Sequence, residues 1–272
     1  MSHHGGSPLA SGARRHDSME MSTSGPGTIS DQVRTYWDLD AATYDHSAGH
    51  HPRTALELAV WAGSLRRLLP PPPARVLDVG AGTGFLSILL ARHGYDMTAV
   101  DLSEGMLGRL KAKAGDAGLE ITTIHADAGE TPVEAFDAVV ERHLLWTIPG
   151  PRAALEAWRR SAPLGRLVLV ESLWGSAGGY LEKLRKGGHE ALRRLRGAQH
   201  DHHAEYSTEL RANFPLSGGA TPDQLVALVE STSWGPARVE RLRDVEWATR
   251  QALPSFADRW LGVAPHFAVV AG

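Results

Sequence analysis

The chain has 272 residues, of which 42% are apolar, contains no cysteine and carries a formal net charge of −3. This length predicts one domain, or one domain with a sizeable insertion, and the apolar content excludes a wholly disordered chain. The lack of cysteine excludes disulfides, thiolate catalysis and cysteine-based metal sites. The small negative charge gives no global reason to bind nucleic acid.

The first 28 residues are rich in Gly, Ser, Pro and His and predict a disordered tail without an apolar signal segment. No apolar run reaches the roughly 18 residues that a membrane-spanning helix needs. We therefore expect a cytoplasmic protein that does not bind a membrane. Met1, Met19 and Met21 all remain candidates for the native start.

Two helices are predicted in an N-terminal segment, residues 29–70. The first, Ile29–Asp45, places Val33, Tyr36, Trp37 and Leu39 largely on one side. The second runs from about Arg53 to Leu69 and must end at the four prolines that follow, because proline cannot continue a helix.

Between residues 74 and 171, short apolar strands alternate with amphipathic helices, a pattern typical of a parallel sheet covered on both faces. The alternation stops over residues 172–219, where we expect two helices, around Tyr180–Arg196 and Ala204–Ala212. Residues 220–272 return to the pattern with one helix and two strands, "RVERLRDVEWA" and "HFAVVAG". These strands leave little room for a helix between them and are expected to pair antiparallel.

A glycine-rich loop follows the first strand, in "VLDVGAGTGFLSILL". Gly80, Gly82 and Gly84 let the backbone turn tightly beside a helix N-terminus and approach a ligand. A dinucleotide-binding loop needs its third glycine where Phe85 stands, which argues against a nicotinamide-dependent oxidoreductase. Asp101 ends the next strand, 21 residues after Gly80, where a carboxylate can accept ribose hydroxyls. Asp127 follows the third strand and can accept from an adenine amino group.

Together, "LDVGAGTG", "VDLSEGML", "ADAGE" and "FDAVVERH" resemble the class I S-adenosylmethionine-dependent methyltransferases. The resemblance implies a Rossmann-like α/β sheet of seven strands, with an N-terminal helical lid and a helical substrate cap inserted after the fifth strand. It implies S-adenosylmethionine as cofactor and S-adenosylhomocysteine as product. The implied cofactor-binding residues are Tyr36, Asp78, Gly80, Ala81, Gly82, Gly84, Asp101, Leu102, Met106, Asp127, Ala128 and Glu141.

Glu141, Arg142 and His143 follow the buried run "FDAVV" and are expected at the mouth of this site. His143 is a candidate base for the acceptor's proton. Arg142 is a candidate to orient an anionic or carbonyl group, or to brace the cofactor carboxylate. The alternative is a structural salt bridge between Glu141, Arg142 and a neighbour. In that case the hydrogen bonds of His143 are satisfied within the protein and the residue has no catalytic role. Leu144, Leu145 and Trp146 are expected to pack against the next helix.

Further candidate catalytic residues are Tyr44, Tyr206 and His203. Tyr44, and after it Tyr36, are expected to touch cofactor or acceptor, unless these rings only fasten the helix to the core. The cluster His200, His202 and His203 matches no strong metal-binding template, so we predict no metal.

The sequence therefore predicts methyl transfer to a small-molecule acceptor, an electron-rich phenol- or indole-like specialised metabolite. The alternatives are an N-methyltransferase of a small amine or peptide-like metabolite, or a cofactor-binding protein without transferase activity. No nucleic-acid partner is expected, and a homodimer is left open.

Overall fold

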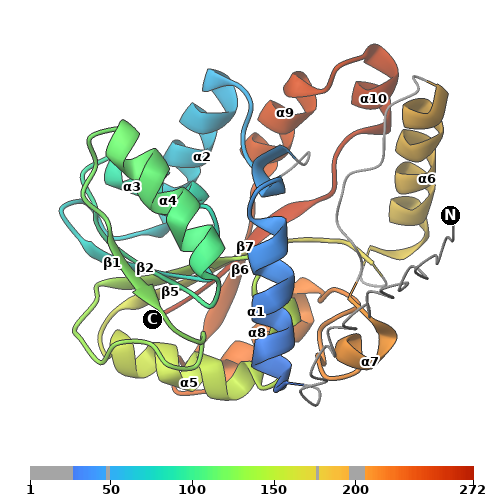
Figure 1. Ribbon diagram of the computed structural model, residues 1–272. Helices are drawn as coiled ribbons and strands as arrows, with labels where there is room; N and C mark the ends of the chain where they lie inside the picture. Colours follow the sequence, from blue (N-terminus) through green and yellow to red (C-terminus); the bar gives the residue numbers. More distant parts are fainter. Residues whose placement is uncertain (1–26, 47–49, 176–177, 196–205) are drawn as a thin grey trace, which may run out of the picture.

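A mixed sheet of seven strands forms the centre of the computed structural model, which describes residues 27–46, 50–175, 178–195 and 206–272 (Figure 1). The strands are β1 (Arg75–Val79), β2 (Asp96–Asp101), β3 (Thr122–His125), β4 (Ala138–Arg142), β5 (Arg166–Ser172), β6 (Ala237–Arg241) and β7 (His266–Ala271). Their order is β3-β2-β1-β4-β5-β7-β6, and only β7 runs antiparallel to its neighbours. The predicted seven-stranded Rossmann-like sheet is confirmed.

Helices cover both faces of the sheet because successive side chains on each strand point to opposite sides. On one face, Val76 and Val140 pack among residues of α2 (Ala55–Leu68), α3 (Phe85–Ala91) and α9 (Arg243–Ala252). On the other, Leu77 and Val139 pack against α5 (Pro151–Ser161) and α8 (Pro222–Glu230). A further helix, α4 (Glu104–Asp116), packs beside α3. Strand order changes direction next to β1 and β4, which places a crevice at the carboxyl ends of these strands.

The expectation that no helix separates the last two strands is wrong. β6 ends at Arg241, and α9 and α10 (Phe256–Leu261) lie between it and β7. The buried residues Leu242, Val245 and Ala248 recur every three positions, which is the spacing of one helix face. The antiparallel pairing of the two strands is confirmed, with Arg241 opposite Phe267.

The N-terminal segment is helical but shorter than predicted. α1 (Ile29–Asp40) begins with a capping box between Thr28 and Asp31 and ends before a short 3-10 turn, η1 (Tyr44–His46). Leu39 is 79% exposed, so its expected place on the packed side of this helix is wrong. α1 packs on α4 and lies over the carboxyl edge of the sheet (Figure 1).

In its described residues the insertion after β5 contains α6 (Gly179–Leu195) and α7 (Thr208–Arg211), and the second is shorter than the expected helix around Ala204–Ala212. Among the helices of the described ranges, none has both the length and the apolar character to cross a membrane.

Candidate functional site

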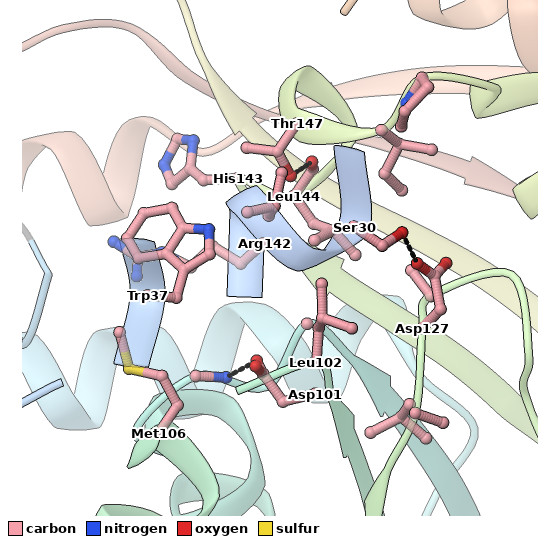
Figure 2. Close-up of a pocket in the computed structure, with 18 of the residues that line it drawn as sticks. Ser30, Trp37, Asp101, Leu102, Met106, Asp127, Arg142, His143, Leu144 and Thr147 are labelled. Atoms are coloured by element: carbon pink, nitrogen blue, oxygen red, sulfur yellow. Dashed lines mark hydrogen bonds between the residues drawn. The ribbon is translucent and has the colours of Figure 1, made fainter. Parts of the chain in front are cut away.

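A pocket opens at the carboxyl ends of β1, β2 and β4, underneath α1 (Figure 2). It holds about 830 Å³ of space without protein atoms, part of it open to solvent. Of the predicted site residues, ten line it: Tyr44, Gly80, Gly82, Asp101, Leu102, Met106, Asp127, Ala128, Arg142 and His143.

The three glycines of the loop have two different roles. Gly80 and Gly82 line the pocket, and both have positive φ angles. A Cβ atom on Gly80 would lie 2.7 Å from Leu144 Cδ1, so this position needs glycine for close packing as well. Gly84 does not line the pocket. Its φ is 89°, and a Cβ atom there would lie 2.6 Å from Leu110 Cγ, so Gly84 lets α3 begin directly against α4.

Asp101 is fixed by two backbone donors at the end of β2. Its Oδ2 accepts from the N–H of Gly82 at 2.7 Å, and its Oδ1 accepts from the N–H of Ser103 at 2.8 Å. Burial raises the pKa of this carboxyl, and the two hydrogen bonds oppose that rise. Each carboxylate oxygen has two lone pairs, so one on each remains for a ligand hydroxyl.

Asp127 accepts a hydrogen bond from Ser30, a residue that was not predicted from the sequence. The hydroxyl of Ser30 donates to Asp127 Oδ2 at 2.9 Å, while Oδ1 accepts from the N–H of Gly129 (Figure 2). Ser30 lies in the first turn of α1, and no local pattern announces a contact with a residue 97 positions later.

α1 and η1 are held over the pocket at two more places. Asp38 Oδ1 accepts from the Ser103 hydroxyl at 2.6 Å and from the N–H of Gly105 at 3.0 Å. Asp45 accepts from the Thr83 hydroxyl at 2.5 Å and pairs with Lys113 at 2.8 Å. These contacts tie the roof of the pocket to the glycine loop and to α4.

Three of the predicted cofactor residues support the pocket from behind and do not line it. Asp78 is buried in β1, where its Oδ2 accepts from the Ser87 hydroxyl at 2.6 Å, and burial raises its pKa to about 7. Ala81 belongs to the loop itself, and its buried side chain packs with Leu107 and Leu110 of α4. Glu141 is fully buried and its Oε2 accepts from the N–H of Leu144 at 2.9 Å, which fixes the turn after β4.

Arg142 and His143 form the opposite wall. The Arg142 guanidinium lies 4.9 Å from the centre of the Phe85 ring and donates to the carbonyl of His50 at 3.3 Å. Burial lowers the pKa of Arg142. A guanidinium nevertheless stays protonated near neutral pH, so Arg142 brings positive charge to an enclosed site.

His143 adopts a left-handed conformation, with φ at 56°, which is uncommon for a residue other than glycine. Its Nδ1 lies 2.9 Å from Glu171 Oε2, and 26% of its side chain is exposed. Burial, followed by the charge of Arg142, lowers its pKa to about 3. Since the ordinary pKa of imidazole is about 6.5, this environment favours the neutral ring.

The aromatic residues divide between the pocket and its surroundings. Tyr44 lines the pocket and stacks on His50 at 4.1 Å between ring centres, and burial raises its pKa. Tyr36 and Tyr206 contact each other at 4.4 Å and lie outside the pocket lining, in an aromatic cluster. Trp37, the next residue of α1, lines the pocket instead.

The histidine candidates of the insertion, His200, His202 and His203, are not among the residues that the structure describes. Over the part of the chain that the structure describes, no group of three or more His, Asp or Glu side chains is arranged to hold a metal ion. The pocket lining also includes residues not predicted from the sequence: Ile29, Ser30, Val33, Trp37, Val100, Ala126, Leu144, Thr147, Ile148 and Pro149.

Comparison with known proteins identifies the family. A family model described as "Methyltransferase domain" matches residues 76–163. The demethylmenaquinone methyltransferase of Clavibacter sepedonicus is 37% identical over 48% of this chain and 57% of its own length. The phosphatidylethanolamine N-methyltransferase of Cereibacter sphaeroides is 30% identical over 60% of this chain and 74% of its own length. The chain belongs to the S-adenosylmethionine-dependent methyltransferases.

Solved structures of this methyltransferase fold agree. Magnesium protoporphyrin IX methyltransferase from Synechocystis PCC 6803 with bound S-adenosylhomocysteine has a TM-score of 0.56 at 16% identity, over 89% of this chain and 99% of that one. The cyclase SpnF has a TM-score of 0.58 at 16% identity, over 90% of this chain and 97% of that one. Identities this low show a shared fold. The chain spans about half the length of the first curated relatives it matches, 57% and 44%.

Proposed function

We propose that the protein transfers a methyl group from S-adenosylmethionine to a small-molecule acceptor. The observation that carries the proposal is one pocket with two separate walls. Asp101 and Asp127 lie at the ends of neighbouring strands on one side, and His143 lies across from them on the other (Figure 2). A site of this kind holds a cofactor beside a group that can take a proton.

The residues present fit the cofactor. Gly80 and Gly82 leave the backbone open to a ligand, and the oxygens of Asp101 keep lone pairs for two ribose hydroxyls. Asp127 has an oxygen that already accepts a hydrogen bond from Ser30 and that can accept from an adenine amino group. The bound cofactor supplies a methyl group already activated by a sulfonium, so the chain has to position the acceptor and receive its proton.

The acceptor is proposed to be an electron-rich phenol- or indole-like molecule. Trp37, Ile148 and Pro149 add apolar surface to the pocket that His143 also lines, which suits a flat apolar ring that carries one dissociable proton. The names of the relatives, a demethylmenaquinone and a phosphatidylethanolamine methyltransferase, include both ring and amine acceptors. A small-amine acceptor is therefore the second candidate. A cytoplasmic location, specialised metabolism and the absence of a nucleic-acid partner remain predictions, and a homodimer remains open.

Titration of the purified protein with S-adenosylmethionine and S-adenosylhomocysteine tests the proposal. We expect saturable binding by calorimetry, and at 100 times the dissociation constant about 2.7 kcal/mol of added stability in thermal unfolding. Phenols, indoles and amines are then screened by mass spectrometry for a gain of one methyl group. Binding without transfer to any acceptor class would favour a cofactor-binding protein, as the fold shared with the cyclase SpnF allows. A folded protein that binds neither compound would contradict the proposal.

Asp101→Ala is expected to weaken S-adenosylmethionine binding by roughly 10–150-fold. One hydrogen bond to a charged group is worth about 1.5–3 kcal/mol, and the substitution removes such an acceptor from the ribose. Calorimetric titration of the variant measures the loss. Asp96→Ala is the matched control, because Asp96 begins the same strand and its side chain is 70% exposed. Equal affinities of the two variants would remove Asp101 from the cofactor site.

A further inference from the structure

The apolar residues of α6 lie on the outside of the protein. Tyr180, Leu184 and Leu195 are 74%, 53% and 84% exposed, and Gly187 and Ala191 are exposed between them. Steps of three or four residues separate these five positions, which therefore share one side of the helix, here called the outer stripe. An amphipathic helix of a globular protein normally turns its apolar side toward the core, so the outward stripe indicates a docking surface.

The polar side of α6 faces the neighbouring helix α10 (Figure 1). His189 Nε2 lies 2.9 Å from the carbonyl oxygen of Gly262, and His189 Nδ1 lies 3.3 Å from Asp258 Oδ1. Arg185 pairs with Glu182, one helical turn away, and both side chains are largely buried. Because these residues lie opposite the outer stripe, α6 cannot rotate to bury the stripe without breaking their contacts.

The charge of α6 is mainly positive. The helix contains five Lys or Arg and two Glu residues, whereas the whole chain has a net charge of −3. Lys183, Lys186 and Arg194 are exposed. An exposed apolar stripe on a basic helix is typical of helices that lie in the interface between a membrane and water. The ring of Tyr180 suits that depth as well, since tyrosine has an apolar body and a polar hydroxyl.

Two observations favour a membrane over a protein as the occupant of the outer stripe. Even large aromatic side chains bury only about 150–250 Å² each, so one tyrosine and two leucines offer less than the roughly 800 Å² that each partner contributes to a standard protein interface. A second copy of α6 on the stripe would also bring two positively charged helices together, which costs free energy. Anionic lipid headgroups carry the complementary charge.

α6 lies at the same edge of the sheet as the pocket. β5 runs parallel to β4 and β1, so its carboxyl end at Ser172 reaches the edge on which the pocket opens, and α6 begins seven residues later. In this connection Trp174 contacts the ring of Trp146 at 5.5 Å between ring centres, and Trp146 lies two positions after the pocket residue Leu144. A surface bound by α6 is therefore on the pocket side of the protein.

We propose that α6 binds the surface of a membrane that contains anionic lipid, with the outer stripe in the interface and the Lys and Arg side chains at the phosphates. Because the pocket opens on the same side, its acceptor is then a lipid-soluble compound taken from that membrane. Only this second statement rests on the proposed function. The expectation that the protein does not bind a membrane came from the lack of a spanning segment, which a helix lying on the surface does not need.

Sedimentation of the purified full chain with vesicles tests membrane binding. One set of vesicles contains phosphatidylcholine alone, and the other contains equal amounts of phosphatidylcholine and phosphatidylglycerol. We expect partitioning to the anionic vesicles to be roughly 100-fold stronger, because each of the three net positive charges of α6 adds about fivefold near an anionic surface. This preference should weaken as the salt concentration rises.

The double variant Leu184→Glu/Leu195→Glu tests the outer stripe. We expect at least about tenfold weaker partitioning, since burial of even one leucine side chain is worth about that factor. Val133→Glu/Leu164→Glu is the matched control, because it makes the same change of charge at two exposed positions away from α6. Both variants should keep the wild-type Tm and affinity for S-adenosylmethionine, since none of the four side chains is buried or lines the pocket under α1.

Equal binding to neutral and anionic vesicles, or equal binding by the stripe variant and its control, would overturn the proposal. So would a wild-type protein that ignores vesicles. If in that case the stripe variant also changed from dimer to monomer by light scattering, the stripe would be a contact between two copies.

The acceptor is tested separately. Once an acceptor has been found, anionic vesicles should raise kcat/KM for a lipid-soluble form of it and leave kcat/KM for a short, water-soluble analogue unchanged. Equal values with and without vesicles would contradict the lipid-soluble acceptor. A protein that binds anionic vesicles but no S-adenosylmethionine would defeat the proposed function and leave membrane binding in place.

Discussion

His143→Asn is expected to lower kcat by about 10²–10⁴-fold, the usual contribution of a general base, and to leave S-adenosylmethionine affinity nearly unchanged. Asparagine tolerates the left-handed conformation that His143 adopts at φ 56°, so the change removes the imidazole without adding backbone strain. Cofactor affinity should persist because Asp101 and Asp127 lie on the other wall of the pocket. Steady-state kinetics with a phenolic acceptor measures the change in kcat, and a calorimetric titration measures the affinity for S-adenosylmethionine.

His93→Asn serves as the control for this experiment. His93 is an exposed histidine after α3 whose Nδ1 bonds the carbonyl of Leu89, and it does not line the pocket. Turnover should match the wild type. If His143→Asn also retains full turnover on a phenol, His143 is not a base and acts only as part of the wall. Retention with an amine acceptor alone would be expected, because a neutral amine can be methylated without prior proton removal.

Gly84→Val is expected to destabilise the fold by about 2–6 kcal/mol. The first part of this cost is a β-branched residue at φ 89°, which is worth about 1–3 kcal/mol of strain. The second is overpacking, again about 1–3 kcal/mol, because the new Cβ would lie 2.6 Å from Leu110 Cγ. Thermal unfolding should show a fall in Tm on the order of 10 °C.

Gly108→Val is the matched control, since Gly108 lies in α4 on its exposed side and an added Cβ would meet nothing within 4 Å. Its Tm should stay the same or rise slightly, because glycine is the poorer helix former. A Gly84→Val variant as stable as the control would mean that α3 and α4 can separate at little cost. If Gly84→Val instead lost cofactor binding while its Tm stayed unchanged, Gly84 would have to be assigned to the ligand site after all.

The sheet and the pocket wall that contains Asp101 and Asp127 were predictable because their signals are local. Glycines follow the first strand, Asp101 ends the second and Asp127 comes shortly after the third. This pattern indicates a parallel sheet and its binding edge without any long-range information. The sequence after β6 was mistaken for a strand because charged residues interrupt its apolar positions and produce an alternating pattern. The buried residues are in fact Leu242 and Val245, which have helical spacing.

The missed parts of the site depend on contacts that no short pattern contains. Glu171 reaches His143 across 28 residues, and only the register of β4 on β5 determines that their side chains meet. Ser30 and Asp127 are 97 residues apart. The different role of Gly84 requires knowing that Leu110 packs over it, since the loop pattern alone gives all three glycines the same meaning.

The roof formed by α1 has a consequence for reaction speed. Ser30 and Asp38 of α1 bond Asp127 and Ser103, and Asp45 of the adjoining η1 pairs with Lys113. The Ser30 contact uses the Asp127 oxygen that is proposed to meet adenine. Because this roof covers part of the pocket, we expect its opening to assist cofactor entry and product release, a motion of the microsecond-to-millisecond kind that limits turnover in many enzymes. Solvent viscosity and changes at Ser30 should therefore alter how long S-adenosylhomocysteine stays bound, even where they leave the methyl-transfer step untouched.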